Sequence, residues 1–258
     1  MAHNHTSSPW INRWRYKPQA RLRLFCFPYA GGGASIFRFL SEQAPAEIEI
    51  CPVQLPGREN RLSEPAFFSL DLLLATLLKI LSPYFDIPYA FFGHSMGALI
   101  SFELARSLRQ IRQIRKPGHL FVSGHRAPHL SDPRPPAHLL PDPQLIETLR
   151  RLHGTPEDVL EHGELLQLLL PLLRADFTLC ETYNYRLEPP LSCPISALGG
   201  LQDQEVPHES ILAWRQHTSD SFQTHFFPGN HFFLNTEQKA LSTVLFHDIY
   251  NNLMKERL

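Results

Sequence analysis

The chain has 258 residues, of which 43% are hydrophobic and 19% are charged. A long disordered chain is therefore excluded, and the length suits one large α/β domain as the first expectation. The 24 Lys and Arg residues nearly balance the 25 Asp and Glu residues, which leaves a formal net charge of −1. No global electrostatic field therefore favours nucleic acid or an anionic membrane, and we expect neither as a partner.

The cysteines and the apolar segments bear on cofactors and location. The four cysteines are scattered with no C-x-x-C pattern, which argues against a disulfide framework and a zinc site. We expect buried thiols, no metal and no cofactor. The first residues lack the apolar core of a secretory signal, and the longest apolar stretches are too short to span a bilayer. The expectation is a soluble cytoplasmic protein, with a monomer favoured.

Short apolar segments alternate with helical segments along most of the chain. The expected strands are residues 21–27, 49–55, 88–93, 119–124, 194–199 and 223–228. Helical spacing predicts helices at residues 35–43, 70–81, 96–112, 209–217 and 236–253. This alternation predicts βαβ units, and therefore an α/β fold with a mostly parallel central sheet flanked by helices.

One region, at about residues 126–185, interrupts the alternation. It has no strand candidate, and a proline-rich entry is followed by leucine-rich helical sequence. We expect a helical insertion at the carboxyl edge of the sheet, where such segments commonly cover a substrate. An ordinary helical subdomain is the alternative. The expected organisation is an N-terminal extension at residues 1–20 and a single domain at residues 21–258.

The strongest local signal is a G-x-S-x-G motif at residues 93–97. It directly follows a predicted apolar strand and directly precedes a predicted helix. A serine on such a turn has a strained backbone, and the flanking glycines avoid collisions with neighbouring backbone. The helix N-terminus also favours negative charge that develops near the serine oxygen. The motif predicts that Ser95 is a nucleophile.

A serine nucleophile needs a base, and the base needs an acid that orients it. In this architecture the acid and then the base follow the serine in the chain. Asp203 comes just beyond the strand at residues 194–199, and His231 comes just beyond the strand at residues 223–228. Both side chains should therefore emerge at the same edge of the sheet as Ser95, and we expect these three residues to form a catalytic triad.

Other titratable residues compete less well for these roles. His208, His217 and His225 lie in or beside the interiors of predicted helices or strands. Asp176 lies in the middle of an inserted helix, and we expect it to pair with a neighbour such as Arg174 or to be solvated.

A glycine-rich turn at residues 28–33 follows the first predicted strand. Such a turn could supply one amide of an oxyanion hole, while the amide of Met96 supplies the other. A nucleotide-binding loop is an alternative, but Ile36 stands where the third glycine of G-x-G-x-x-G should be, and the chain has no G-K-[ST] sequence. A plain structural turn is the second alternative.

Together these segments resemble the type II thioesterases that accompany polyketide and nonribosomal peptide synthetases, and the related medium-chain thioesterase of fatty acid synthesis. The matching segments occur in the family's order: FPYAGG at residues 27–32, LPGRE at 55–59, FGHSMG at 92–97, LRADF at 173–177, residues 200–203, Trp214 and GNHFF at 229–233. Asn230 departs from the glycine that the family often has. Residues 1–20 and the tail after Asn251 have no useful match.

The resemblance implies an α/β-hydrolase fold with an inserted, flexible helical lid. It implies hydrolysis of acyl groups from the phosphopantetheine arm of an acyl or peptidyl carrier protein, which would be a transient partner, and an editing role on mischarged carriers. The triad would be Ser95, Asp203 and His231, and the oxyanion amides would be those of Ala30 and Met96.

Three other functions stay open from the sequence. A general carboxylesterase would use the same triad without a carrier protein. A medium-chain acyl carrier thioesterase of fatty acid synthesis would differ in its acyl preference. A noncatalytic acyl-binding module could keep the same fold. The sequence does not identify the substrate-binding residues or the preferred acyl chain.

Overall fold

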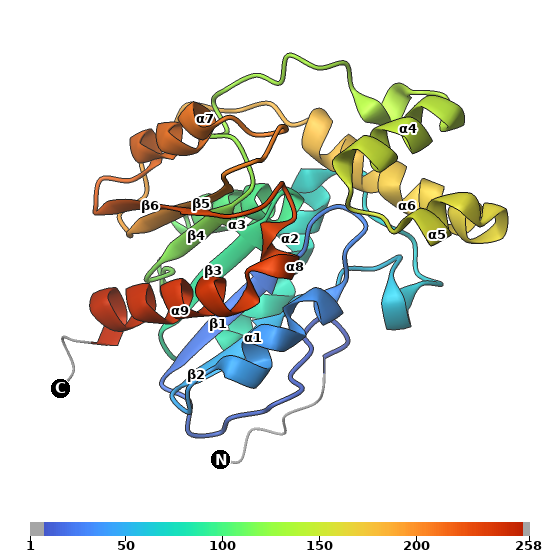
Figure 1. Cartoon of the computed structure of the whole chain (residues 1–258). Helices are drawn as coiled ribbons and strands as arrows, with labels where there is room; N and C mark the ends of the chain where they lie inside the picture. The colour runs from blue at the N-terminus through green and yellow to red at the C-terminus, as the bar shows by residue number, and fades with distance from the viewer. Residues whose placement is uncertain (1–7, 255–258) are drawn as a thin grey trace.

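A six-stranded parallel sheet forms the centre of the molecule, with strand order β2-β1-β3-β4-β5-β6 (Figure 1). The computed structural model describes residues 8–254. The strands are β1 (Leu22–Phe27), β2 (Ile48–Pro52), β3 (Tyr89–His94), β4 (Leu120–Ser123), β5 (Ile195–Gly200) and β6 (Phe222–Phe227). Every neighbouring pair is parallel. The predicted fold class, a parallel sheet flanked by helices, is confirmed.

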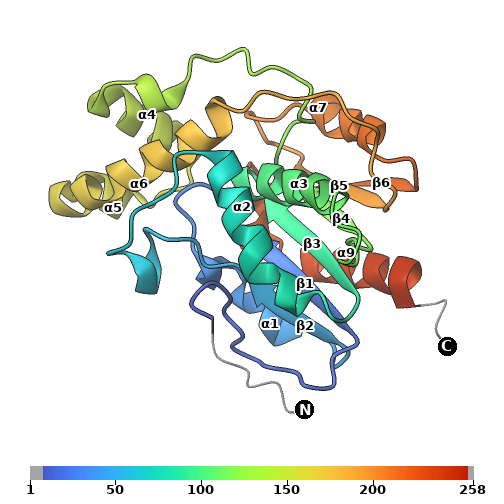
Figure 2. The ribbon, with the colours of Figure 1, turned by 180° about the vertical axis from the view of Figure 1, so that it is seen from behind.

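Helices cover both faces of this sheet. Helices α1 (Arg38–Gln43) and α9 (Gln238–Ile249) lie on one face, and α2 (Leu70–Leu81) and α3 (Met96–Leu108) lie on the other (Figures 1 and 2). The shorter elements are α7 (His208–Leu212), α8 (Phe233–Thr236), a π-helical turn (Tyr250–Met254) and 3-10 turns at Ala34–Phe37, Glu59–Arg61, Ser82–Tyr84, Ala137–Leu139 and Ala213–His217. Within residues 8–254, no helix is both long and apolar enough to cross a membrane.

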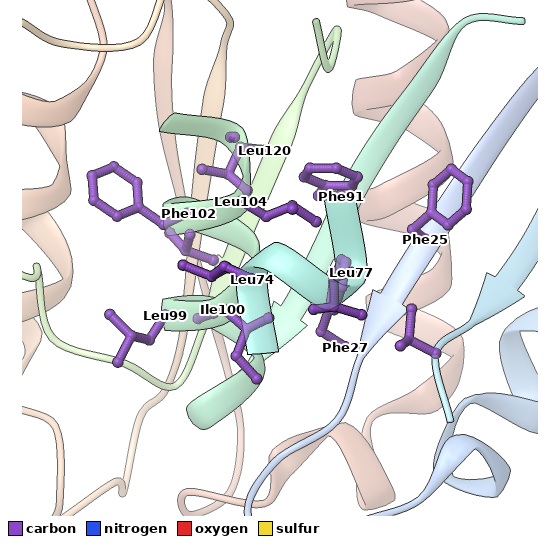
Figure 3. Close-up of a cluster of buried hydrophobic side chains, with 14 of the residues drawn as sticks. Phe25, Phe27, Leu74, Leu77, Phe91, Leu99, Ile100, Phe102, Leu104 and Leu120 are labelled. Carbon is purple, nitrogen blue, oxygen red and sulfur yellow. The ribbon is translucent and has the colours of Figure 1, made fainter. Parts of the chain in front are cut away.

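The double covering explains why the inner strands are mostly apolar. In β1, Phe25 and Phe27 pack toward α2 and α3, whereas Leu24 and Cys26 belong to the apolar cluster beneath α1 and α9. Figure 3 shows Phe25, Phe27 and Phe91 of the sheet next to leucine and isoleucine side chains of the two covering helices. Successive strand side chains point to opposite faces, so strands that are covered on both faces are mostly apolar. The outer strand β6, with the sequence FQTHFF, is only partly buried and more polar.

Helix α3 ends earlier than the sequence predicts. The expected end was residue 112, but the helix stops at Leu108. The ammonium group of Lys116 donates hydrogen bonds to the carbonyl oxygens of Leu108 and Ile111. The same two carbonyls also accept hydrogen bonds from the N–H groups of Ile111 and Ile114, so the chain leaves the helix through hydrogen-bonded turns.

Three helices, α4 (Asp142–Leu152), α5 (Glu157–Glu161) and α6 (Gly163–Glu181), lie between β4 and β5 in the chain. We call them the α4–α6 segment. Figure 1 shows this segment beyond one end of the sheet, above the ends of the strands. The helices share a small apolar core, which includes Leu145, Leu149, Leu160, Leu166 and Leu170. They therefore pack largely against one another.

Residues 8–20 pack against the edge of the sheet. Ile11 is buried and forms an antiparallel bridge with Val53, just beyond the end of β2. The Arg13 guanidinium forms two hydrogen bonds of 2.8 Å with the buried carboxylate of Glu49. Residues 1–7 of the expected N-terminal extension lie outside the described part of the chain.

Candidate active site

Ser95 lies on a sharp turn between β3 and α3. Its φ and ψ angles are 53° and −117°, so it is one of the few non-glycine residues with a positive φ. Its N–H donates to the carbonyl of Ser123 over 2.7 Å, which fixes the turn to β4. A Cβ at Gly93 would lie 2.0 Å from the carbonyl oxygen of Gly97, and one at Gly97 would lie 2.0 Å from that of Phe27. The strained turn that the motif predicts is present, and it depends on both glycines.

Replacing Gly97 by Ala should therefore damage folding. The added methyl group would collide with backbone of Phe27 and Pro28, which cannot move without displacing β1. We expect a loss of several kcal/mol in the free energy of unfolding, measured by urea denaturation. Gly163→Ala is the matched control, because no atom outside its own helix backbone and its chain neighbours lies within 4 Å of the added Cβ. Similar stabilities of the two variants would contradict this reading of the turn.

Asp203 and His231 are brought together by two loops that bond to each other. The N–H of Leu201 donates to the carbonyl of Phe227 over 2.8 Å, and that of Gln202 donates to the carbonyl of Gly229 over 2.9 Å. These bonds continue the pairing of β5 and β6 beyond the strand ends. The structure therefore places both residues at the carboxyl edge of the sheet, as their positions in the sequence predict.

The carboxylate of Asp203 is fully engaged, and its side chain is 1% exposed. One oxygen accepts hydrogen bonds from the N–H groups of Glu205 (2.8 Å) and Val206 (3.2 Å). The other lies 2.8 Å from Nδ1 of His231. Because an ionised carboxylate only accepts, Nδ1 carries the proton in this bond and Nε2 keeps its lone pair. The pair thus fixes the tautomer that a general base needs.

Two further histidines lie beside His231 without adding charge. Burial lowers the pKa of His94 well below its usual value, and its Nδ1 lies 2.8 Å from the hydroxyl of Ser123. Burial also lowers the pKa of His125 to about 4. Both rings are neutral at pH 7, so they do not repel a positive charge that forms on His231.

Ser95 and His231 line the same cavity, which has a volume of about 630 Å³. Ala30 and Met96 line it too, and neither backbone N–H donates to another group within residues 8–254. The α4–α6 segment closes one side through several side chains, which include Leu149, Leu152, Leu173, Phe177 and Cys180. The cavity therefore combines a serine, an imidazole, two unoccupied backbone donors and apolar walls.

The expected surroundings of Asp176 were wrong. Its side chain is 1% exposed, and it forms a bidentate ion pair with Arg58, with two N–O distances of 2.9 Å. Arg174 instead pairs with Asp142. Residues two positions apart on a helix do not face each other, so Arg174 could not reach the partner that we expected.

This buried ion pair also holds the glycine-rich turn. An oxygen of Asp176 accepts a hydrogen bond of 2.7 Å from the N–H of Gly31, and Arg58 donates one of 3.1 Å to the carbonyl of Gly32. The sequence reasoning missed this arrangement. The available signal was that Arg58 and Asp176 are charged residues within two of the family's matching segments, LPGRE and LRADF.

The serine turn, the carboxylate and imidazole pair and the glycine-rich turn meet at the carboxyl edge of a parallel sheet, which defines an α/β-hydrolase. The family profile described as "Thioesterase domain" matches residues 22–249. The chain belongs to this family of thioester hydrolases.

Two curated relatives extend over most of the chain. "Linear gramicidin dehydrogenase LgrE" of Brevibacillus parabrevis is 48% identical over 249 residues, which cover 95% of this chain and 94% of the relative. "Gramicidin S biosynthesis protein GrsT" of Aneurinibacillus migulanus is 49% identical over 228 residues, which cover 87% and 89%. The name of LgrE refers to a dehydrogenase, but residues 28–36 of this chain lack the dinucleotide-binding glycine pattern.

Solved structures of thioesterases share the fold. The RedJ thioesterase from the prodiginine pathway of Streptomyces coelicolor has a TM-score of 0.82 and 42% identity, and the match covers 88% of this chain and 89% of RedJ. The type II thioesterase BorB from the borrelidin cluster has a TM-score of 0.85 and 36% identity, covering 95% and 99%. Both solved structures are thus titled as thioesterases of biosynthetic pathways.

Proposed function

We propose that this chain is a serine-dependent thioesterase that removes acyl groups from the phosphopantetheine arm of acyl or peptidyl carrier proteins. The observation that carries the proposal is the 2.8 Å contact between Asp203 and His231, with His231 and Ser95 lining one cavity. In this proposal Ser95 is the nucleophile, His231 is the general base and Asp203 orients the imidazole.

The reaction would proceed through an acyl-enzyme. The oxygen of Ser95 attacks the thioester carbonyl while Nε2 of His231 takes the hydroxyl proton. The negative oxygen of the tetrahedral intermediate accepts hydrogen bonds from the backbone N–H groups of Ala30 and Met96. The carbon–sulfur bond then breaks, and His231 returns the proton to the departing thiol. A water molecule, deprotonated by His231, releases the acid in the same way.

The size and position of the cavity support an acyl-pantetheine substrate. A volume of about 630 Å³ lies within the usual range for small-molecule sites, about 300–1,000 Å³. The wall made by the α4–α6 segment would act as a lid that opens for the long arm of a carrier. We further propose that the protein edits mischarged carriers of a polyketide or nonribosomal peptide synthase, since the similar structures ClbQ and YbtT are titled as proteins of NRPS/PKS pathways.

The decisive test compares acyl groups on a carrier protein with the same groups on a free ester. We expect a much higher kcat/KM for decanoyl carrier protein than for decanoyl p-nitrophenyl ester, because the arm and the carrier add binding interactions that the ester lacks. Equal or reversed values would favour a general carboxylesterase. A full comparison of acetyl, decanoyl and aminoacyl carriers would then separate editing from the release of one preferred acid.

The acyl group should lie against the α4–α6 segment. Within this segment, Leu149 lines the cavity, whereas Leu165 and Leu168 are exposed. We expect Leu149→Trp to reduce kcat/KM for decanoyl carrier at least tenfold more than for acetyl carrier, because added bulk removes volume where only the longer chain lies. Leu168→Trp should change neither value. Equal losses for both acyl groups would place the acyl chain elsewhere.

We also propose a cytoplasmic location. The four cysteines are free thiols, and burial raises the pKa of Cys193 to about 12. Unpaired cysteines are typical of proteins from reducing compartments.

A further inference from the structure

We propose that Arg58 and Asp176 are positioning residues that hold the backbone N–H of Ala30 in place for the oxyanion, and that they make this arrangement depend on helix α6. The inference rests on the proposed function, because it concerns how one donor of the oxyanion hole is built. Neither residue lines the cavity, so neither touches the substrate.

The ion pair between Arg58 and Asp176 is hydrogen-bonded to the glycine-rich turn at two residues. Asp176 accepts from the N–H of Gly31 and Arg58 donates to the carbonyl of Gly32, with distances of 2.7 and 3.1 Å. Gly31 has a φ of 77°, a conformation that other residues rarely adopt. Because Asp176 occupies the N–H of Gly31, that group cannot serve the oxyanion. The ion pair thereby selects the preceding N–H, that of Ala30, as the donor of this turn.

Arg58 is itself fixed by the loop after β2. Its Nε donates to the carbonyl of Pro56 over 3.2 Å, and its own carbonyl accepts from the amide of Gln54 over 3.1 Å. The carbonyl oxygen of the Gln54 side chain accepts from the N–H of Ala34 over 2.8 Å. This loop is therefore bonded to the carboxyl end of the glycine-rich turn, at Gly32 and at Ala34 just beyond it. Arg58 acts as a rigid support rather than a mobile surface cation.

Helix α6 contacts Arg58 and the glycine-rich turn through Asp176 and through close packing. A Cβ at Gly31 would lie 2.7 Å from Leu173, and one at Gly57 would lie 3.2 Å from Leu172. Phe177 and Cys180 of the same helix line the cavity. If α6 moved outward to admit a carrier arm, it would remove the acceptor of the Gly31 N–H. The oxyanion hole would then be complete only when α6 is seated over the substrate.

A stabilising role alone does not account for this ion pair. Replacing a buried ion pair by apolar residues of similar size is often neutral or stabilising, whereas removal of one partner leaves a buried charge unpaired. The double variant Arg58→Met/Asp176→Leu should therefore fold even if Asp176→Leu alone does not. In the double variant, the Gly31 N–H and the Gly32 carbonyl both lose their partners.

We expect the double variant to have a kcat about 100-fold below that of the wild type for decanoyl carrier protein, with KM changed less than about threefold. Loss of a single oxyanion donor typically lowers kcat by about 10²–10³. Asp142→Asn is the matched control. It removes an exposed ion pair between α4 and Arg174 of α6, the helix that also carries Asp176, and it does not touch the glycine-rich turn. This control should keep the wild-type kcat.

Two inhibitors distinguish a loss of oxyanion binding from a general loss of binding in the cavity. A decyl trifluoromethyl ketone forms an oxyanion when Ser95 adds to it, whereas decanoyl-pantetheine amide binds without reacting. In the double variant, the affinity for the ketone should fall by the same factor as kcat/KM, while the affinity for the amide stays within about threefold. A wild-type kcat, or equal losses for both inhibitors, would overturn the inference. Failure of the proposed function is distinct, because the wild type itself would then not hydrolyse the carrier thioester.

Discussion

Replacing Ser95 by Ala should reduce kcat for acyl carrier hydrolysis by about 10⁴-fold or more. The nucleophile, base and acid of a triad act as a unit, so loss of the nucleophile removes nearly the whole catalytic advantage. Folding should survive, because Ser95 is held by its backbone N–H and the new residue keeps its Cβ. The measurement is steady-state hydrolysis of decanoyl carrier protein, together with thermal unfolding.

A labelling experiment gives an independent check. A fluorophosphonate should modify the wild-type chain at one site, Ser95, and should not modify the Ser95→Ala variant. If the variant kept even a tenth of the wild-type activity, the nucleophile would be another residue. Complete absence of labelling in the wild type would favour the noncatalytic acyl-binding module instead.

Replacing Asp203 by Asn should lower kcat by about 10⁴-fold. An amide nitrogen facing Nδ1 would donate rather than accept, so the imidazole would turn to the tautomer in which Nε2 carries the proton. Such an imidazole cannot accept the proton of Ser95. The expected signature is a loss in kcat with little change in KM or in the free energy of unfolding.

The chain contains a close control for this variant. Asp248 is also buried and also contacts a histidine, His225, at 3.1 Å, but neither residue lines the cavity. Although burial alone would raise it, hydrogen bonds from His225 and Ser196 lower the pKa of Asp248 to about 2. Asp248→Asn should therefore cost stability at neutral pH and leave kcat unchanged. A larger loss of kcat for Asp248→Asn than for Asp203→Asn would contradict the assignment of the acid.

Local signals in the sequence were sufficient to place the sheet and three side chains of the candidate site. Continuous apolar runs predict strands that are covered on both faces, and β1 has this environment. Parallel strands all end at one edge, so Asp203 and His231 could be placed near each other although nothing in their own segments indicates the contact. The G-x-S-x-G motif predicts the conformation of the Ser95 turn by itself, because only glycine fits at residues 93 and 97.

The contact between Arg58 and Asp176 could not be derived in this way. The two residues are 118 positions apart, and the partner of Asp176 depends on how α6 lies across the glycine-rich turn. Helical periodicity gives the buried face of a helix but not the group opposite each residue on that face. The same limit applies to the leucines of the α4–α6 segment: Leu145 and Leu149 both belong to its apolar core, but of the two only Leu149 also lines the cavity.

The N-terminal residues that pack beside β2 cover part of an outer strand of the sheet. An uncovered outer strand presents N–H and C=O groups to which a strand of another molecule can pair, and such pairing leads to aggregation. Here the N–H of Asn12 donates to the carbonyl of Pro52, and the N–H of Gln54 donates to that of Trp10, both at an N–O distance near 2.9 Å. The region that matches the thioesterase family begins at residue 22, so a chain trimmed to that region would lose this cover. Residues 8–20 thus cover the carboxyl end of an outer strand, which the family region by itself leaves open to other molecules.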